Sequence, residues 1–308
     1  MRGISAVIPV YNGATTIARA IDSVLAQRFD GEIELVVVND GSTDSTPHVL
    51  ERYGSKINVL TQPNRGLAAA RNAGAAATSG DYLAFLDADD YWLPDHLART
   101  SAALDRNPKA VLAFCDGILL DERGEEVDPS PAGRAPTMED LLRCSWRILS
   151  DAVIMRRSVF ALCGGFCEEF TALGGEDVHM WLRAREHGEF EYVPERLVVY
   201  NIPPFMVRAE KYDKGCQILI RLIRRRYGRA AKPLIDHVSS YFAPAFVQKA
   251  LQQMDSGDWK AALHTWARLL RLKPSHLLDW RYVQRLFRPR NLRRLTGVFH
   301  APIHAERS

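Results

Sequence analysis

The sequence has few cysteines and no long apolar run, and both absences exclude whole classes of protein. Its five cysteines are odd in number and form no C-x-x-C pair, which is typical of reduced thiols and not of a disulfide framework or a clustered zinc site. No stretch of about 18 uncharged apolar residues occurs, so no membrane-spanning helix is predicted. The segment Met1 to Pro9 is too short and too soon interrupted by proline for a signal peptide. We therefore expect a cytoplasmic protein.

Charge is distributed unevenly along the 308 residues, although the net charge is only +3. From Phe205 to the end there are 21 Lys and Arg against 7 Asp and Glu, whereas 19 basic and 30 acidic residues precede it. This shift predicts a boundary between an acidic body, residues 1–204, and a basic region, residues 205–308. The basic region could contact anionic lipid, an anionic acceptor or the acidic body itself. No nucleic-acid-binding fold signature accompanies the charge, so we expect no nucleic-acid partner.

The first part of the chain alternates short β-branched runs with helical patterns. Strands are predicted over Ile4–Val10, Glu34–Val38, Ile57–Thr61 and Tyr82–Leu86. Helices are predicted after Thr15 or Thr16, from Ser42 or Thr43 to about Tyr53, and over Leu67–Ala77. This rhythm predicts an α/β protein whose mainly parallel sheet has helices on both faces. Ligands of such sheets bind beyond the carboxyl ends of the strands.

The second part continues with less regular signals. Further strands are predicted over Val111–Leu120, Ala152–Met155 and Glu191–Tyr200, and helices over Ser158–Leu162 and Asp177–His187. Asp121 to Pro136 is polar and contains Gly and Pro, which indicates a flexible loop. After Pro203-Pro204 the pattern is helical, with an amphipathic helix over Trp259–Leu272.

An acidic cluster, Asp87-Ala88-Asp89-Asp90, follows the fourth predicted strand. Three carboxylates in four residues repel one another unless a cation lies between them. Their oxygen ligands suit a hard divalent ion such as Mg²⁺ or Mn²⁺, which could neutralise a diphosphate. The alternative for this segment alone is a solvated acidic loop that caps the next helix.

Four segments together make a family resemblance. They are Ala6-Val-Ile-Pro-Val-Tyr-Asn12, Val38-Asn-Asp-Gly-Ser-Thr-Asp44, Asn64-Arg-Gly-Leu-Ala-Ala-Ala-Arg-Asn-Ala-Gly74 and Gly80-Asp-Tyr-Leu-Ala-Phe-Leu-Asp-Ala-Asp-Asp90. In this order and spacing, over roughly the first two thirds of the chain, the sequence resembles glycosyltransferase family 2 with its GT-A fold. The resemblance implies a Rossmann-like donor half, residues 1–110, and an acceptor half, residues 111–204, followed here by the basic helical region.

The resemblance also implies roles on the nucleoside side. Asp40 would accept a hydrogen bond from the N3–H of uracil or thymine, although an aspartate before Gly41 is also typical of a turn. Pro9 and Tyr11 would line the nucleoside pocket, with a core tyrosine as the alternative. Arg71 could reach a phosphate or the base, and a surface arginine is its alternative.

Within the acidic cluster the resemblance distributes the roles. Asp89 is the expected ligand of Mn²⁺ or Mg²⁺ at the donor diphosphate. Asp87 would contact the ribose or the metal through water, beside Ala88. Asp90 is expected to cap or support the loop.

A second motif, Gly174-Gly175-Glu176-Asp177, follows a Gly-Gly-Phe turn and begins a predicted helix. By the resemblance Asp177 is the general base that deprotonates the acceptor hydroxyl, and Glu176 orients the acceptor. The helix dipole is expected to keep Asp177 ionised, and a negatively charged first turn is the alternative interpretation. Trp181 could supply an aromatic platform for a sugar or pack in the core. Val178-His179-Met180 departs from the family pattern and leaves the acceptor open.

These residues predict an inverting transfer of one sugar from a UDP- or dTDP-sugar to a hydroxyl of a glycan or glycolipid, as in polysaccharide biosynthesis. Gln217-Ile218-Leu219-Ile220 does not match the Gln-x-x-Arg-Trp motif of processive members, so a single addition is expected. A sugar nucleotidyltransferase, which normally carries a lysine-rich phosphate loop, and an inactive nucleotide-sugar-binding protein are the alternatives. Arg224-Arg225-Arg226 is either a solvated helix face or a peripheral contact with anionic membrane.

Overall fold

The computed structural model describes residues 3–127, 131–143, 146, 148–170, 174–202 and 205–272. Contacts divide the chain into two compact units, Met1–Leu234 and Ile235–Ser308. The contacts place the boundary after the first helix of the basic region, because that helix packs against the helix at Glu176–Arg185 of the acidic body. Residues 273–308 of the predicted basic region lie outside the described residues.

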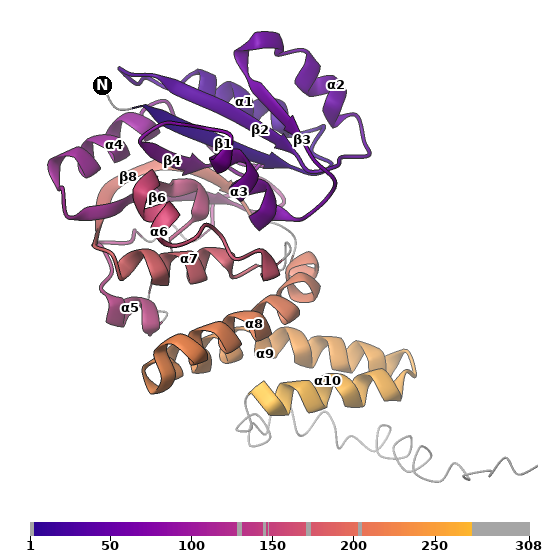
Figure 1. Ribbon diagram of the computed structural model, residues 1–308. Helices are drawn as coiled ribbons and strands as arrows, with labels where there is room; N and C mark the ends of the chain where they lie inside the picture. The colour runs from indigo at the N-terminus through magenta and orange to yellow at the C-terminus, as the bar shows by residue number, and fades with distance from the viewer. Residues whose placement is uncertain are drawn as a thin grey trace, which may run out of the picture. The chain divides into compact units, whose positions relative to one another are not determined.

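One sheet of eight strands organises the first unit (Figure 1). Its spatial order is β3-β2-β1-β4-β7-β6-β8-β5. The strands are β1 (Ile4–Val10), β2 (Ile33–Asn39), β3 (Asn58–Thr61), β4 (Tyr82–Phe85), β5 (Tyr91–Trp92), β6 (Ala110–Leu120), β7 (Val153–Arg156) and β8 (Glu189–Asn201). The strands from β3 to β4 are parallel, as predicted from the β-α rhythm.

The other half of the sheet is mixed, which the sequence did not indicate. β7 runs antiparallel to both β4 and β6, and the two-residue β5 runs antiparallel to β8. β6 and β8 are parallel, with a bulge around Cys115 and Asp116. The antiparallel β7 matters for the site, because it brings the start of β7 beside the carboxyl end of β4.

Helices cover both faces of this sheet. Those of the first unit are α1 (Ile17–Leu25), α2 (Thr46–Glu51), α3 (Leu67–Ala76), α4 (His96–Arg106), α5 (Met138–Leu142), α6 (Arg157–Leu162), α7 (Glu176–Arg185) and α8 (Phe205–Tyr227). Successive residues of β1 point to opposite faces, and all seven are buried, as a central strand requires.

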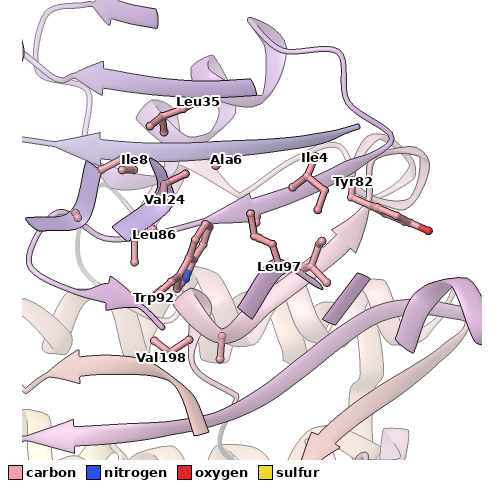
Figure 2. Close-up of a cluster of buried hydrophobic side chains, with 14 of the residues drawn as sticks. Ile4, Ala6, Ile8, Val24, Leu35, Tyr82, Leu86, Trp92, Leu97 and Val198 are labelled. Atoms are coloured by element: carbon pink, nitrogen blue, oxygen red, sulfur yellow. The ribbon is translucent and has the colours of Figure 1, made fainter. Parts of the chain in front are cut away.

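On one face, the even-numbered residues of β1 pack against α1 and α4. Figure 2 shows Ile4, Ala6 and Ile8 in this cluster together with Val24 and Leu97. On the opposite face, Gly74 of α3 lies so close to β1 that an added Cβ would be 2.3 Å from a methyl carbon of Val7. The alanine- and glycine-rich sequence of α3 thus allows the helix to lie directly on the sheet.

Helix α2 begins later than the sequence predicts. The expected start was Ser42 or Thr43, whereas the helix begins at Thr46 with Ser45 as its N-cap residue. Ser42, Thr43 and Asp44 instead hydrogen-bond the loop that follows β1. Polar side chains of this size compete with helix formation by making such local bonds.

The second unit contains α10 (Trp259–Leu272) and α9 (Lys232–Asp255), apart from the first three residues of α9. Ala262 and Trp266 of α10 are buried, and Thr265 Oγ1 donates to Gln253 Oε1 of α9 at 2.8 Å. The predicted amphipathic helix over Trp259–Leu272 is therefore confirmed. Across the described helices, no segment is both long and apolar enough to cross a bilayer.

Candidate active site

A cavity of about 430 Å³ opens where β1, β2 and β4 end and α7 begins. Nine of the ten predicted site residues line it: Pro9, Tyr11, Asp40, Arg71, Asp87, Ala88, Asp89, Glu176 and Asp177. Parallel strands end at one edge of a sheet, which explains why motifs far apart in the sequence meet here. The cavity is thus lined by both predicted motifs, the acidic cluster that begins at Asp87 and the Glu176-Asp177 pair.

The loops after β1 and β2 are tied together on the nucleoside side of the cavity. Asn12 has a φ of 54°, and its Oδ1 accepts hydrogen bonds from the backbone N–H groups of Thr43 and Asp44. The Asn12 N–H donates to Ser42 Oγ at 3.0 Å. Asparagine is one of the few residues that adopt this left-handed conformation readily. These contacts between the two loops define this wall of the pocket.

Asp40 is buried and organises the loop that leads to α3. Its carboxylate accepts from Gln62 Nε2 at 2.7 Å, from the Arg65 N–H at 2.9 Å and from the Gly66 N–H at 2.8 Å. A carboxylate has about four acceptor positions, so the side chain retains capacity for one more donor in the cavity. Tyr11 lies at the cavity mouth with 52% of its surface exposed, which suits packing on a flat ring.

Asp151, a residue that the sequence analysis did not select, lies against the acidic cluster. Oxygen atoms of Asp87, Asp90 and Asp151 all lie within 4.8 Å of one another. The antiparallel register pairs Ala84 with Ile154, so the chain segments at Asp87 and Asp151 meet just beyond the strand ends. The Asp87 N–H donates to Asp151 Oδ1 at 2.5 Å. An acidic residue directly before a predicted buried strand was the available sequence signal.

Asp89 faces the cavity with an exposed side chain and lies outside this group of three. Its backbone carbonyl accepts from Arg19 Nη2 at 2.9 Å and from Asn201 Nδ2 at 2.6 Å. The backbone N–H of Asn201 donates to Asp90 Oδ1 at 2.7 Å. The end of β8 therefore holds the acidic loop in place through Asp90, in line with the predicted role of Asp90. Asp90 also lies beside the carboxylates of Asp87 and Asp151.

Asp90 and Asp151 of this group resist ionisation. Burial, followed by the charge of Asp87, raises the pKa of Asp151 to about 8. Burial, together with Asp151, Asp89 and Asp87, raises the pKa of Asp90 well above its usual range. A divalent ion would relieve this repulsion, and hard oxygen ligands suit Mn²⁺ or Mg²⁺. The residues present therefore fit the predicted metal.

Arg71 lies in the cavity floor and is not a surface residue. It is 1% exposed, and its Nη2 donates to Asp87 Oδ1 at 2.6 Å while its Nη1 donates to Glu176 Oε1 at 3.1 Å. The two carboxylates raise its pKa above the usual value although burial opposes this. The alternative of a surface arginine is therefore wrong.

Asp177 lies in the first turn of α7, after Gly175 in the left-handed region at a φ of 96°. Its Oδ1 accepts from the Val178 N–H at 2.7 Å. Loss of solvation, followed by the charge of Glu176, raises the pKa of Asp177 to about 7. The expectation that the helix dipole keeps this group ionised is wrong, because desolvation and a neighbouring carboxylate outweigh the dipole.

Trp181 is the predicted site residue that the structure does not bring to the cavity. It is 3% exposed, and its neighbours Met180 and Leu182 are also buried. Ala184, one turn further along α7, is buried as well, so the indole packs in the interior. The expectation of an aromatic platform for the acceptor is wrong for this reason.

Comparison with known sequences decides the family. Residues 5–160 match the model of glycosyl transferase family 2. The chain belongs to this family. Among its relatives, an uncharacterized glycosyltransferase from Nostoc sp. is 48% identical over 143 residues, which is 45% of this chain and 44% of the relative. A putative glycosyltransferase, EpsH, from Bacillus subtilis is 40% identical over 96 residues, 30% of this chain and 28% of the relative. The matched part thus spans less than half of these relatives.

Solved structures show that the fold is that of GT-A enzymes. S. aureus TarS 1–349 in complex with UDP superposes with a TM-score of 0.56 at 20% identity, over 90% of this chain and 92% of TarS. The mannosyltransferase PcManGT from Pyrobaculum calidifontis, in complex with GDP-Man and Mn²⁺, gives a TM-score of 0.56 at 19% identity, over 92% and 84%. At this identity the likeness concerns the fold, and the predicted GT-A α/β architecture with C-terminal helices is confirmed.

Proposed function

We propose that this family 2 protein is an inverting glycosyltransferase that moves one sugar from a UDP- or dTDP-sugar to a hydroxyl of a glycan or glycolipid. The observation that carries the proposal is that one cavity is lined by Asp40, by the acidic loop at Asp87 to Asp89, and by Asp177. One cavity would then hold a hydrogen-bond acceptor for the nucleobase, carboxylates for a metal ion at the diphosphate, and a carboxylate that can act as the general base. Family membership favours this activity over the nucleotidyltransferase alternative.

The donor side of the proposal uses residues whose positions the protein itself stabilises. Asp40 would accept the N3–H of the base while Tyr11 packs on the ring, and both line the cavity. Mn²⁺ or Mg²⁺, when bound, would neutralise the diphosphate that leaves. Asp89 and Asp87 remain the predicted ligands, and Asp90 and Asp151 lie close enough to Asp87 to hold or orient the ion.

The acceptor side needs a base that loses its proton near neutral pH, and the raised pKa of Asp177 meets this need. Its carboxylate would take the proton of the acceptor hydroxyl as the oxygen bonds to the anomeric carbon. The bond from that carbon to the diphosphate oxygen breaks at the same time on the opposite side. Attack opposite the leaving group inverts the anomeric configuration.

Titration calorimetry with UDP, dTDP and GDP, each with Mn²⁺ and then with EDTA, tests the donor site. We expect at least one nucleotide to bind about tenfold more tightly with the metal, a difference of about 1.4 kcal/mol. Asp89→Asn should remove this gain. Asp81→Asn, an exposed acid at the other end of β4, is the matched control and should keep it. Equal binding with and without metal would contradict the metal role of Asp89.

A further inference from the structure

Arg71 is the largest fully buried side chain among the described residues. A buried guanidinium is stable only when its charge and its N–H groups are satisfied by well-placed partners. Its partners are unusual because they come from distant parts of the chain. Asp87 follows β4, Ser150 precedes β7, and Glu176 begins α7.

The bonds of Arg71 divide between the two ends of the cavity. Nη2 donates to Asp87 Oδ1 at 2.6 Å and to Ser150 Oγ at 3.3 Å, on the acidic-loop side. Nη1 donates to Glu176 Oε1 at 3.1 Å, on the α7 side. The Phe166 ring lies 5.2 Å from the guanidinium carbon and shields it from water. One rigid, planar group therefore contacts both motifs.

The charges of this network do not balance. Two carboxylates face one guanidinium, and both ion pairs are shielded from solvent at Arg71. Within the described protein, Arg71 Nε and Glu176 Oε2 are buried without a hydrogen-bond partner. The arrangement is thus incomplete at the end where the acceptor would bind. A cation beside Asp87 would weaken the attraction between the Asp87 carboxylate and Arg71. The ion pair between Arg71 and Glu176 would then become relatively stronger.

We propose that Arg71 is a positioning residue that couples the donor-metal end of the cavity to Glu176 and to the first turn of α7, which carries Asp177. The inference rests on the proposed function for the identity of the two ends. Coupling between two binding sites is reciprocal, so a bound acceptor should also strengthen donor binding. Lysine is not equivalent to arginine here, because its compact ammonium lacks the rigid planar fork that holds two N–H donors at fixed positions toward two carboxylates.

Hydrogen exchange of α7 tests the coupling without any measurement of transfer. The full chain is compared with and without Mn²⁺ and the nucleoside diphosphate that binds tightest among UDP, dTDP and GDP. We expect the amides of residues 176–181 to exchange about fivefold more slowly in the complex, the lower end of usual coupling. In Arg71→Lys and in Glu176→Gln this response should disappear, while nucleotide affinity changes less than about threefold.

Arg157→Met is the matched control. Arg157 is likewise held by several hydrogen bonds from one guanidinium, four in its case, to Gly80, Ala75, Ser5 and Thr78, but at the opposite edge of the sheet. This variant should lose stability and keep the α7 response. If Arg71→Lys does not fold, Glu176→Gln decides alone, because it retains an acceptor for Arg71 Nη1 and removes only a charge.

Kinetics separate this inference from the proposed function. With a transferring donor and acceptor, Arg71→Lys should lower kcat/KM for the acceptor by about tenfold or more with little change in donor KM. If the wild type binds nucleotide and both variants keep its hydrogen-exchange response in α7, the proposed coupling is wrong. Failure of the wild type to bind any of the nucleotides would instead overturn the proposed function.

Discussion

Asp177 lies where a helix dipole and a neighbouring carboxylate act on its proton in opposite directions. The dipole favours the charged form by less than about 1 kcal/mol at an exposed helix end, whereas one pKa unit corresponds to about 1.4 kcal/mol. Desolvation and Glu176 dominate and raise the pKa of Asp177 to about 7. A base with this pKa is half ionised at neutral pH and still accepts a proton readily.

Transfer should therefore depend on pH through Asp177. Only the ionised carboxylate can accept a proton, and a raised pKa means that this form is lost as pH falls below about 7. We expect kcat/KM for the acceptor to fall about fivefold from pH 7 to pH 6, with nucleotide binding preserved. Asp177→Asn should lose about 10²- to 10⁴-fold in rate at all pH values. A flat profile between pH 6 and 8 would contradict the assignment of the base.

His96 offers a prediction on stability. It is fully buried against Trp92 and Cys115, and burial lowers its pKa to about 3. The unfolded chain takes up a proton below about pH 6.5, while the folded protein does not, so this group lowers stability as pH falls. Between pH 7 and pH 5 the loss is about 2 kcal/mol.

Chemical denaturation of His96→Leu at both pH values checks this. The variant should lack about 2 kcal/mol of the wild type's pH dependence, whatever its stability at pH 7. An equal pH dependence in both proteins would show that the unfolded and folded states protonate His96 alike.

At the scale of elements, the turn before α7 is held by α3. Asn72 of α3 donates from Nδ2 to the Phe166 carbonyl at 2.9 Å and accepts at Oδ1 from the Phe166 N–H at 2.8 Å. Gly164 and Gly165 both have a φ of 72°, which L-residues rarely adopt. The helix that carries Arg71 thus also holds the Gly164-Gly165-Phe166 turn.

The two glycines form a matched pair for a stability measurement. An added Cβ at Gly165 would lie 2.7 Å from Asn72 Oδ1, whereas none of the atoms around Gly164 lies within 4 Å of its added Cβ. Both Gly→Ala changes should cost about 1–2 kcal/mol for the left-handed backbone. Gly165→Ala should cost about 1–3 kcal/mol more for the clash, as thermal unfolding would show. Equal losses would mean that the Asn72 contact is easily displaced.

At the scale of the whole molecule, the chain separates an acidic body from a basic C-terminal region. Arg224, Arg225 and Arg229 are exposed at the end of the first basic helix and just after it. Arg226 instead forms an ion pair with Glu186 and so belongs to the body. We propose that the exposed arginines contact anionic membrane peripherally, which would bring a lipid-linked acceptor to the site.

Co-sedimentation with vesicles of anionic and of neutral lipid tests the membrane contact. Binding to anionic vesicles should weaken with salt, and a triple Ala variant of Arg224, Arg225 and Arg229 should lose about 1 kcal/mol per residue. A triple Ala variant of Arg52, Arg106 and Arg123, exposed arginines of the acidic body, is the control and should bind like the wild type. Equal binding to neutral vesicles would contradict an electrostatic contact.

Much of the donor half could be predicted from residues because its signals are local. Apolar runs placed β1, β2, β3 and β4 to within a residue or so of their observed ends. Turn residues then placed Asp40 and Asp87 just after strands, and parallel strands bring such positions to one edge. The start of α2 depends on contacts within the loops, so the sequence placed it too early. The ionisation of Asp177, at the start of α7, depends on burial, which the sequence did not indicate.

The remaining features of the site required the folded chain, because they arise from pairing between segments far apart in sequence. The antiparallel β7 brings Asp151 to Asp87, and the end of β8 brings Asn201 to Asp90. The hydrophobic pattern of the sequence does not indicate which strand pairs with β4. The same is true of burial, which places Trp181 in the interior and pairs the buried Arg71 with a carboxylate from each of the two acidic motifs.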